Sequence, residues 1–307
     1  HKLADMAASA FAMHSISDFS AAVADDESMD IRLEAAAAKE WNTVRSWELI
    51  DETLQIRGGR GYETEASLEG RGEPPIGVER MLRDARINLI FEGSSEIMHL
   101  FMAREAVDKH LEVAGALVDP KASLSDKLKA LPGIAAFYAV WYPTRWLGWG
   151  RWPRFAAFGR LATHLRFAER SSRKLAREIF HGMNVYQARL QRKQAFLFRA
   201  VDIANELFAM SVSVARADAM RRADDPDAAA ATELADLFCR TSRRRVKALF
   251  RGLWSNDDAR AYRIGRNTLD GRYLFLEQDG IGLGIDADAM RPRTTAPHQE
   301  EAERTRV

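Results

Sequence analysis

Cysteine and long apolar segments are both scarce in this chain of 307 residues. The single cysteine, Cys239, cannot form an intramolecular disulfide, so the chain is not a disulfide scaffold. His and Cys residues do not occur at the spacings that hold zinc, and we expect no metal site. No apolar run reaches the roughly 18 residues that a membrane-spanning helix requires, and no cleavable signal leads the chain. We therefore expect a cytoplasmic protein that does not span a membrane.

The composition is that of a globular protein. Hydrophobic residues make up 47% and charged residues 29% of the chain, which excludes a disordered or collagen-like protein. The chain exceeds the size at which single cores usually divide, so we expect two domains. The first residue is His1, within a segment that already has helical periodicity. We therefore expect that the N-terminal part of a longer protein is missing.

Charge is distributed unevenly along the chain, although the net charge is only +1. Residues 1–119 contain 12 basic and 23 acidic residues, whereas residues 120–307 contain 33 basic and 21 acidic residues. Residues 121–200 alone contain 16 basic and 3 acidic residues. We expect the two parts to face different partners.

The sequence predicts an all-α fold, because apolar residues recur at helical spacing almost throughout and clear strand patterns are absent. A helix is expected over residues 31–57, and Gly58 and Gly59 supply the backbone conformations that end it. Glycine, proline and charged residues predict a surface loop over residues 60–77.

A segment with the pattern helix, tight corner, helix follows this loop. The helical period restarts at Val78 and is expected to end near Glu92, and Gly93 breaks it. Either Ser94 or Ser95 is expected to cap the next helix.

Beyond Pro120 the sequence predicts a second helical domain. Pro143 and Pro153 are expected to break a helical hairpin, and the tail is too polar to fold. Long helices are expected near residues 156–182, 187–223 and 227–252. The predicted division is a first domain at residues 1–118, a linker at 119–126, a helical extension at 127–290 and a disordered tail at 291–307.

Two segments have the composition of functional sites. QIRGGRGY, at Gln55–Tyr62, is a glycine-rich corner whose amides are free to approach a phosphate, but no strand precedes it as in a nucleotide-binding turn. RDARINLIFEGSSEI, at Arg83–Ile97, places the Glu92 carboxylate at the break between two helices. Taken singly, the glycines are better explained as a helix C-cap and Glu92 as an acid at a helix N-terminus.

Together, the motifs resemble the C-terminal helical domain of flavin-dependent acyl-CoA dehydrogenases. The resemblance covers residues 1–118 and implies a helical bundle, followed here by a second helical domain. The motifs that carry it, in order, are the LADM opening helix, the AAAAK helix, QIRGGRGY, VERMLRDARI, FEGSSEI and AREAVDKHL.

The resemblance implies that Glu92 is the catalytic base, that Gly93 lets the substrate approach closely, and that the cofactor is FAD. The residues that it assigns to the adenosine diphosphate part of an FAD bound to a neighbouring subunit are Gln55, Ile56, Arg57, Gly58 and Gly59. The residues that it assigns to the flavin on the catalytic side are Ser94, Ser95 and Glu96. Ser94 replaces the family's usual threonine but keeps the hydroxyl group.

The implied reaction converts an acyl-CoA to a trans-2-enoyl-CoA in fatty acid β-oxidation. The α-proton of a thioester is weakly acidic, so its removal requires a base and stabilisation of the developing enolate oxygen. The resemblance further implies a medium- to long-chain substrate, an electron-transfer flavoprotein as electron acceptor, and a homodimer or homotetramer.

The chain also departs from the family pattern. The loop ETEASLEGRGEPPIG, between Tyr62 and Val78, is longer than in the family's shorter members. The family's N-terminal helical domain, its β-domain and an upstream FAD-binding arginine have no counterpart in these residues. We therefore expect this chain to be inactive alone.

A third segment, Phe137–Phe155, contains four of the seven tryptophans, interleaved with arginines. Tryptophan and arginine together favour a membrane interface, so we expect peripheral contact with the inner face of the membrane. The position of this extension resembles that in very-long-chain acyl-CoA dehydrogenases. Packing of the tryptophans against the first domain is the alternative, and we expect no nucleic-acid binding because no recognised module is present.

Two other functions stay open at this point. An acyl-CoA oxidase shares the base and a C-terminal extension but transfers electrons to oxygen. A catalytically silent scaffold would use its basic, tryptophan-rich half to dock on a membrane or a partner, although the presence of Glu92 argues against it.

Overall fold

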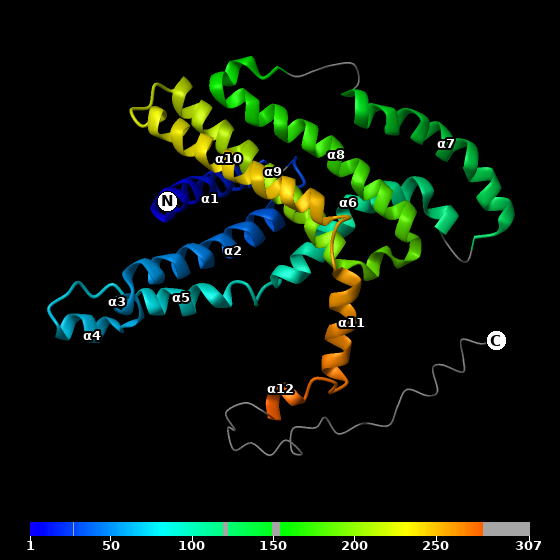
Figure 1. Cartoon of the computed structure of the whole chain (residues 1–307). Helices are drawn as coiled ribbons and strands as arrows, with labels where there is room; N and C mark the ends of the chain where they lie inside the picture. The colour runs from blue at the N-terminus through cyan, green and yellow to red at the C-terminus, as the bar shows by residue number, and fades with distance from the viewer. Residues whose placement is uncertain (27, 119–121, 149–153, 279–307) are drawn as a thin grey trace. The chain divides into compact units, whose positions relative to one another are not determined.

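The computed structural model describes residues 1–26, 28–118, 122–148 and 154–278, which contain helices and no strands, so the all-α prediction is confirmed (Figure 1). The helices in the first half of the chain are α1 (Lys2–Ala24), α2 (Arg32–Arg57), α3 (Gly59–Tyr62), α4 (Glu65–Gly70), α5 (Val78–Ile87) and α6 (Ser95–Val118). Those in the second half are α7 (Leu124–Leu147), α8 (Ala162–Tyr186), α9 (Gln194–Arg222), α10 (Ala228–Gly252), α11 (Asp258–Leu269) and α12 (Phe275–Gln278). Two 3₁₀ helices, η2 (Ala156–Leu161) and η3 (Gln187–Arg192), precede α8 and α9.

The chain divides into two compact units, His1–Ser255 and Asn256–Val307. The described helices of the second unit are α11 and α12, and α11 has no buried residue. In both units, no described helix combines the length and the apolar character needed to cross a bilayer.

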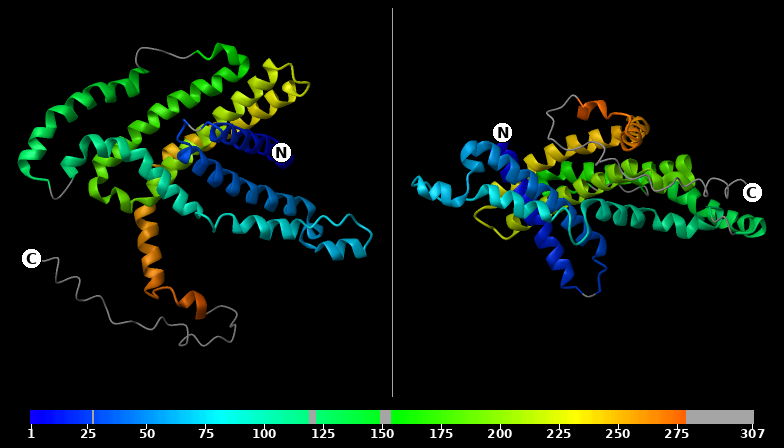
Figure 2. Two further views of the ribbon diagram at one scale, coloured as in Figure 1. Left: turned by 180° about the vertical axis from the view of Figure 1, so that it is seen from behind. Right: turned by 90° about the horizontal axis from the view of Figure 1, so that it is seen from below.

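Helix α9 lies at the centre of the first unit, where it packs against α1, α6, α8 and α10 (Figures 1 and 2). Apolar residues occur around most of its circumference, as is typical of a buried helix, and Ile203, Met210 and Val214 are fully buried. Trp41 of α2 meets Phe238 of α10 edge to face, with ring centroids 5.6 Å apart. The core therefore includes residues from both sides of the predicted linker.

The core contains residues from before and after the predicted linker at residues 119–126, and it marks no boundary there. The predicted domain division therefore stays a prediction. Residues 119–121 of the linker and the predicted disordered tail at 291–307 lie outside the described residues.

Helix α7 is continuous, so the predicted break at Pro143 is wrong. A proline within a helix removes a hydrogen bond and clashes with the preceding turn, but aromatic contacts hold α7 on both sides of Pro143. Tyr142 packs against Phe180 of α8 at 5.6 Å, and the guanidinium of Arg177 lies 3.8 Å from the centroid of the Trp146 ring. Pro153 lies outside the described residues.

The prediction of a surface loop over residues 60–77 is also wrong in part, because α3 and α4 form within it. Gly61 lets α3 lie flush on α2, since a Cβ atom at this position would be 2.7 Å from the Leu54 carbonyl oxygen. Thr64 caps α4 by accepting a hydrogen bond from the Ser67 amide at 3.3 Å, and Leu68 is fully buried. The other predicted helices appear near their expected positions as α2, α8, α9 and α10.

Candidate active site

The corner between α5 and α6, residues 88–94, carries Glu92. Its backbone closes through hydrogen bonds from the Phe91 amide to the Ile87 carbonyl at 3.1 Å and from the Ser95 amide to the Leu89 carbonyl at 3.2 Å. Glu92 has φ 49°, an uncommon conformation for a residue with a side chain. Its carboxylate is exposed, and in the described part of the chain its amide donates none of the hydrogen bonds that close the corner.

Gly93 completes the corner with φ 89°. A Cβ atom there would lie 1.9 Å from the Cε atom of Met98, a flexible side-chain end that can move aside, so the positive φ is what favours glycine at this position. Helix α5 ends at Ile87, so the predicted helix end near Glu92 is wrong by five residues, and Gly93 lies within the corner that separates α5 from α6.

Ser94, Ser95 and Glu96 form the start of α6. The Ser94 hydroxyl accepts a hydrogen bond from the Ile97 amide at 3.4 Å, which confirms the predicted cap. The backbone N–H of Glu96 and the Ser94 hydroxyl together lower the pKa of the Glu96 carboxyl. The Ser95 hydroxyl is buried and has no hydrogen-bond partner within the described residues.

Lys39 of α2 also contacts this corner, and this contact was not predictable from the sequence. Its ammonium donates hydrogen bonds to the carbonyl oxygens of Gly93 at 2.5 Å, Asn88 at 2.8 Å and Phe91 at 3.4 Å. The AAAAK motif carries the family resemblance, but the spacing of 53 residues between Lys39 and Glu92 gives no local sign of this contact.

Residues 55–59 lie at the other end of α2, next to α3, and do not join the Glu92 corner. Gly58 ends α2 with φ 61°, Gly59 begins α3, and the positions where their Cβ atoms would stand are open. Gln55 and Ile56 are exposed and Arg57 is half-buried. The 16 residues from Lys39 to Gln55 correspond to about 24 Å along a helix, so the predicted site residues form two separate groups.

His99 links the first turns of α6 to α9. Its Nδ1 lies 2.7 Å from the Ser95 carbonyl oxygen and its Nε2 lies 2.8 Å from the Asp202 carboxylate. Both partners accept hydrogen bonds only, so both contacts together require a protonated ring. Burial by itself lowers the pKa of His99, but Asp202, the Glu40 carboxylate and the Ser95 carbonyl raise it to about 8.

Glu40 and Trp41 of α2 extend this buried polar network. Burial raises the pKa of the Glu40 carboxyl, which accepts a hydrogen bond from the Asn205 amide at 2.8 Å. The Trp41 indole donates to Glu206 at 3.3 Å, and Arg245 of α10 donates to the same carboxylate oxygen at 2.9 Å. This network was not predictable from the sequence, because its members are up to 205 residues apart.

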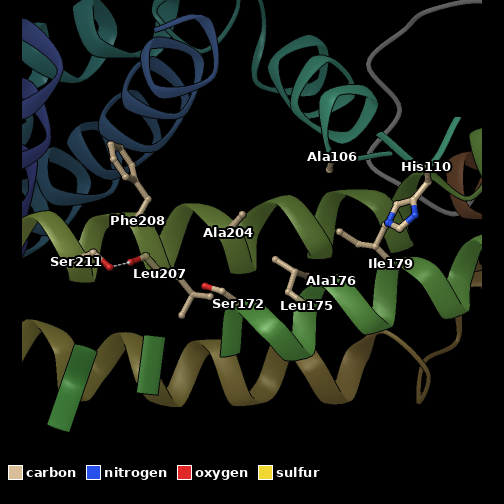
Figure 3. A pocket seen from close by; sticks show the side chains of 10 residues that line it. All are labelled: Ala106, His110, Ser172, Leu175, Ala176, Ile179, Ala204, Leu207, Phe208 and Ser211. Carbon is tan, nitrogen blue, oxygen red and sulfur yellow. Dashed lines mark hydrogen bonds between the residues drawn. The ribbon is translucent and has the colours of Figure 1, made fainter. Parts of the chain in front are cut away.

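A mostly apolar pocket of about 420 Å³ lies between α6, α8 and α9 (Figure 3). Its lining contains none of the predicted site residues. The polar groups at its edge are already engaged, since His110 contacts the Tyr138 hydroxyl at 2.9 Å and Ser211 donates to the Leu207 carbonyl at 2.8 Å. No cluster of His, Cys, Asp and Glu side chains suited to a metal ion occurs among the described residues.

The described part of the aromatic segment has two environments. Trp141 packs against His110 with ring centroids 4.7 Å apart, as the packing alternative predicts. Trp146 is 53% exposed. Trp149 and Trp152 lie outside the described residues.

Known proteins are similar to the segment that carries the Glu92 corner. Residues 1–107 match the family model described as acyl-CoA dehydrogenase, C-terminal domain. The N-terminal part of this chain is therefore similar to an acyl-CoA dehydrogenase C-terminal domain. This agrees with the motif resemblance on which the site residues were assigned.

The similarity to named relatives extends over most of the chain. Probable acyl-CoA dehydrogenase FadE10 of Mycobacterium tuberculosis is 52% identical over 96% of this chain and 46% of its own length. The very long-chain specific acyl-CoA dehydrogenase of rat mitochondria is 30% identical over 83% of this chain and 37% of its own length. The chain thus spans less than half the length of these curated relatives.

Among solved structures, an acyl-CoA dehydrogenase complexed with FAD from Bacillus anthracis matches with a TM-score of 0.58 and 20% identity. The match covers 81% of this chain and 40% of that one. At this identity the likeness shows a shared fold.

We expect the stability of the folded protein to fall as the pH rises from 6.5 through about 8. The folded pKa of His99 lies above its ordinary value of 6.5, so its contribution is complete below pH 6.5 and is lost as the ring deprotonates near pH 8. The pKa of Glu40 is also raised, so the stability that its protonated form contributes is lost from its own ordinary value of 4.5 upward. A loss of about 1–2 kcal/mol is expected.

Urea unfolding at pH 6 and pH 9 measures this loss, with His99→Gln expected to flatten the pH dependence. His14→Gln, at an exposed position on α1, is the control and should leave it intact. Equal pH dependence in the wild type and His99→Gln would show that His99 is not the titrating group.

Proposed function

We propose that this chain is the C-terminal part of an FAD-dependent acyl-CoA dehydrogenase that converts an acyl-CoA to a trans-2-enoyl-CoA, with Glu92 as the base. The observation that carries the proposal is the corner at residues 88–94, where an acyl-CoA dehydrogenase domain presents an exposed carboxylate and a free amide on the same residue. The 52% identical relative named a probable acyl-CoA dehydrogenase supports it.

Glu92 has the two groups that the reaction needs. Its carboxylate would accept the α-proton of the thioester, and its backbone N–H would donate a hydrogen bond to the thioester oxygen as negative charge develops there. Gly93 leaves room for the thioester beside the base. The Glu92 side chain is exposed in this chain, so we infer that the walls that exclude water belong to the acyl chain and to other parts of the whole protein.

The residues present fit an FAD cofactor, which when bound supplies the two-electron acceptor. The Ser95 hydroxyl is a buried polar group with no partner among the described residues, next to the Glu92 corner. We propose that Ser94, Ser95 and Glu96 contact the flavin. The open surface beside Gly58 and Gly59 is suited to close approach by a phosphate.

We propose that residues Gln55–Gly59 contact the FAD of a neighbouring subunit in a homodimer or homotetramer. Gln55 lies about 24 Å along α2 from Lys39, which contacts the Glu92 corner. This separation supports contact with a second FAD, distinct from the one beside Glu92. We further propose a medium- to long-chain acyl substrate in fatty acid β-oxidation, supported by relatives named very long-chain specific acyl-CoA dehydrogenases. Electrons would pass to an electron-transfer flavoprotein.

Glu92→Gln in the complete protein should reduce turnover by orders of magnitude while FAD stays bound, because glutamine keeps the size of the side chain but is not a base. Turnover is measured anaerobically with a dye acceptor, and peroxide release in air is measured in parallel to detect oxidase activity. Glu112→Gln, at an exposed position on α6, is the control. Near wild-type turnover of Glu92→Gln would overturn the assignment.

Gly59→Val should reduce FAD content and subunit association together. The position of a Cβ atom at Gly59 is open and the φ of Gly59 is ordinary, so valine should not disturb this chain's own fold. A loss of FAD would therefore report the loss of a contact between residue 59 and the cofactor. Gly70→Val, at a similarly open position in α4, is the control. Full FAD content in Gly59→Val, measured by flavin absorbance, would show that these glycines serve only to end α2.

We also propose that α7 contacts an anionic membrane, so that the protein is cytoplasmic and peripheral at the inner membrane face. Leu124, Leu128, Leu131 and Trp146 are exposed and share one face of the helix by their spacing. The surrounding residues 121–200 contain 16 basic and 3 acidic residues, which complements anionic headgroups. Trp141 does not belong to this face, because it packs against His110.

The complete protein should co-sediment with anionic vesicles at low salt and less so at high salt, since each basic residue near the surface contributes about 1 kcal/mol and salt screens that attraction. A variant with Trp146, Trp149 and Trp152 changed to Ala should detach while staying folded. Tyr262→Ala, at an exposed position on α11, is the control. Absence of binding to anionic vesicles, or unfolding of the triple variant, would show that the tryptophans serve packing.

A further inference from the structure

Lys39 uses its whole hydrogen-bonding capacity on the Glu92 corner. An ammonium group has three donors and no acceptor, and the structure gives Lys39 three acceptors, which are the carbonyl oxygens of Asn88, Phe91 and Gly93. Its side chain is half-buried between α2 and the corner. No carboxylate forms an ion pair with Lys39 in the described part of the chain, so the charge is balanced by backbone carbonyl dipoles.

The contact with Phe91 fixes the direction of the Glu92 amide. The carbonyl of Phe91 and the N–H of Glu92 belong to one peptide unit, and the peptide bonds described here are trans. In a trans peptide these two groups point in opposite directions. Because the Phe91 carbonyl points toward the Lys39 ammonium, the Glu92 N–H points away from it.

The contact with Gly93 holds a second peptide unit of the corner. The short distance of 2.5 Å from Lys39 to the Gly93 carbonyl holds the peptide between Gly93 and Ser94, on the other side of Glu92. Both chain segments that flank Glu92 are therefore held by one side chain. This restraint opposes relaxation of Glu92 from its uncommon φ of 49°.

We propose that Lys39 is a positioning residue that holds the Glu92 N–H in the orientation needed to bind the thioester oxygen of an acyl-CoA. This inference rests on the proposed function of Glu92. A hydrogen bond to the Phe91 carbonyl also polarises the same peptide unit, which makes the Glu92 N–H a stronger donor. Lys39 does not itself touch substrate in this arrangement.

The test compares Lys39→Met and Lys39→Arg in the complete FAD-loaded protein. Methionine has no donor, and a guanidinium cannot place three donors at the same three points. We expect kcat to fall about 10- to 100-fold in Lys39→Met, the size of effect expected from misplacing a reacting group, with flavin content unchanged. Lys109→Met, at an exposed lysine of α6 that pairs with Glu112, is the control and should retain kcat.

A vibrational measurement separates positioning from a merely structural role. The carbonyl stretch of a bound acyl-CoA analogue, labelled with ¹³C at the thioester carbon, reports the strength of the hydrogen bond at its oxygen. In Lys39→Met this stretch should move back toward its value in water. In the Lys109→Met control it should stay at the wild-type value.

The outcomes separate this inference from the proposed function. Wild-type kcat and carbonyl stretch in Lys39→Met, together with an inactive Glu92→Gln, would overturn the role of Lys39 and leave Glu92 as the base. An active Glu92→Gln would overturn the proposed function itself. If Lys39→Met does not fold or bind FAD, the carbonyl stretch of Lys39→Arg decides, and an unchanged stretch there overturns the inference.

Discussion

Burial of α9 is the constraint on which the rest of this structure depends. A helix with apolar residues around most of its circumference is stable only when neighbours cover all sides, and here α1, α6, α8 and α10 do so. Helix α1 and the first half of α6 lie within residues 1–107, which match the acyl-CoA dehydrogenase C-terminal family model, whereas α8 and α10 lie after them. Residues beyond the family match therefore help to support the segment that carries the candidate site.

The buried polar groups follow from the same arrangement. Packing α6 on α9, with α2 against α1 and α6, places Glu40 and His99 next to Asp202 and Asn205, and each of these groups finds a partner. Buried charges are costly unless they are paired and hydrogen-bonded. The network therefore favours one alignment of α2 and α6 on α9, although replacing it with apolar residues of equal volume could be equally stable.

The helices and the corner at Glu92 were predictable because their signals are local. Periodicity gave α2, α8, α9 and α10, and the glycine and serine of EGSS gave the break and the cap of α6. The continuous α7 was not predictable, because the contacts that hold it across Pro143 come from α8. Lys39 and His99 were missed for a similar reason, since their partners lie 49 to 103 residues away.

Two adjacent residues of α2 connect these features. Lys39 reaches the carbonyl groups of the Glu92 corner, whereas Glu40 faces α9 and the extension. Successive residues on a helix point about 100° apart, so one turn of α2 contacts the corner on one side and the buried network on another. His99 makes the matching connection on α6, between the Ser95 carbonyl beside the corner and Asp202 of α9. The corner is thus held through α2, by Lys39, and through α6, by His99, and both helices are bonded to α9. Its geometry therefore depends on a segment that lies more than a hundred residues further along the chain.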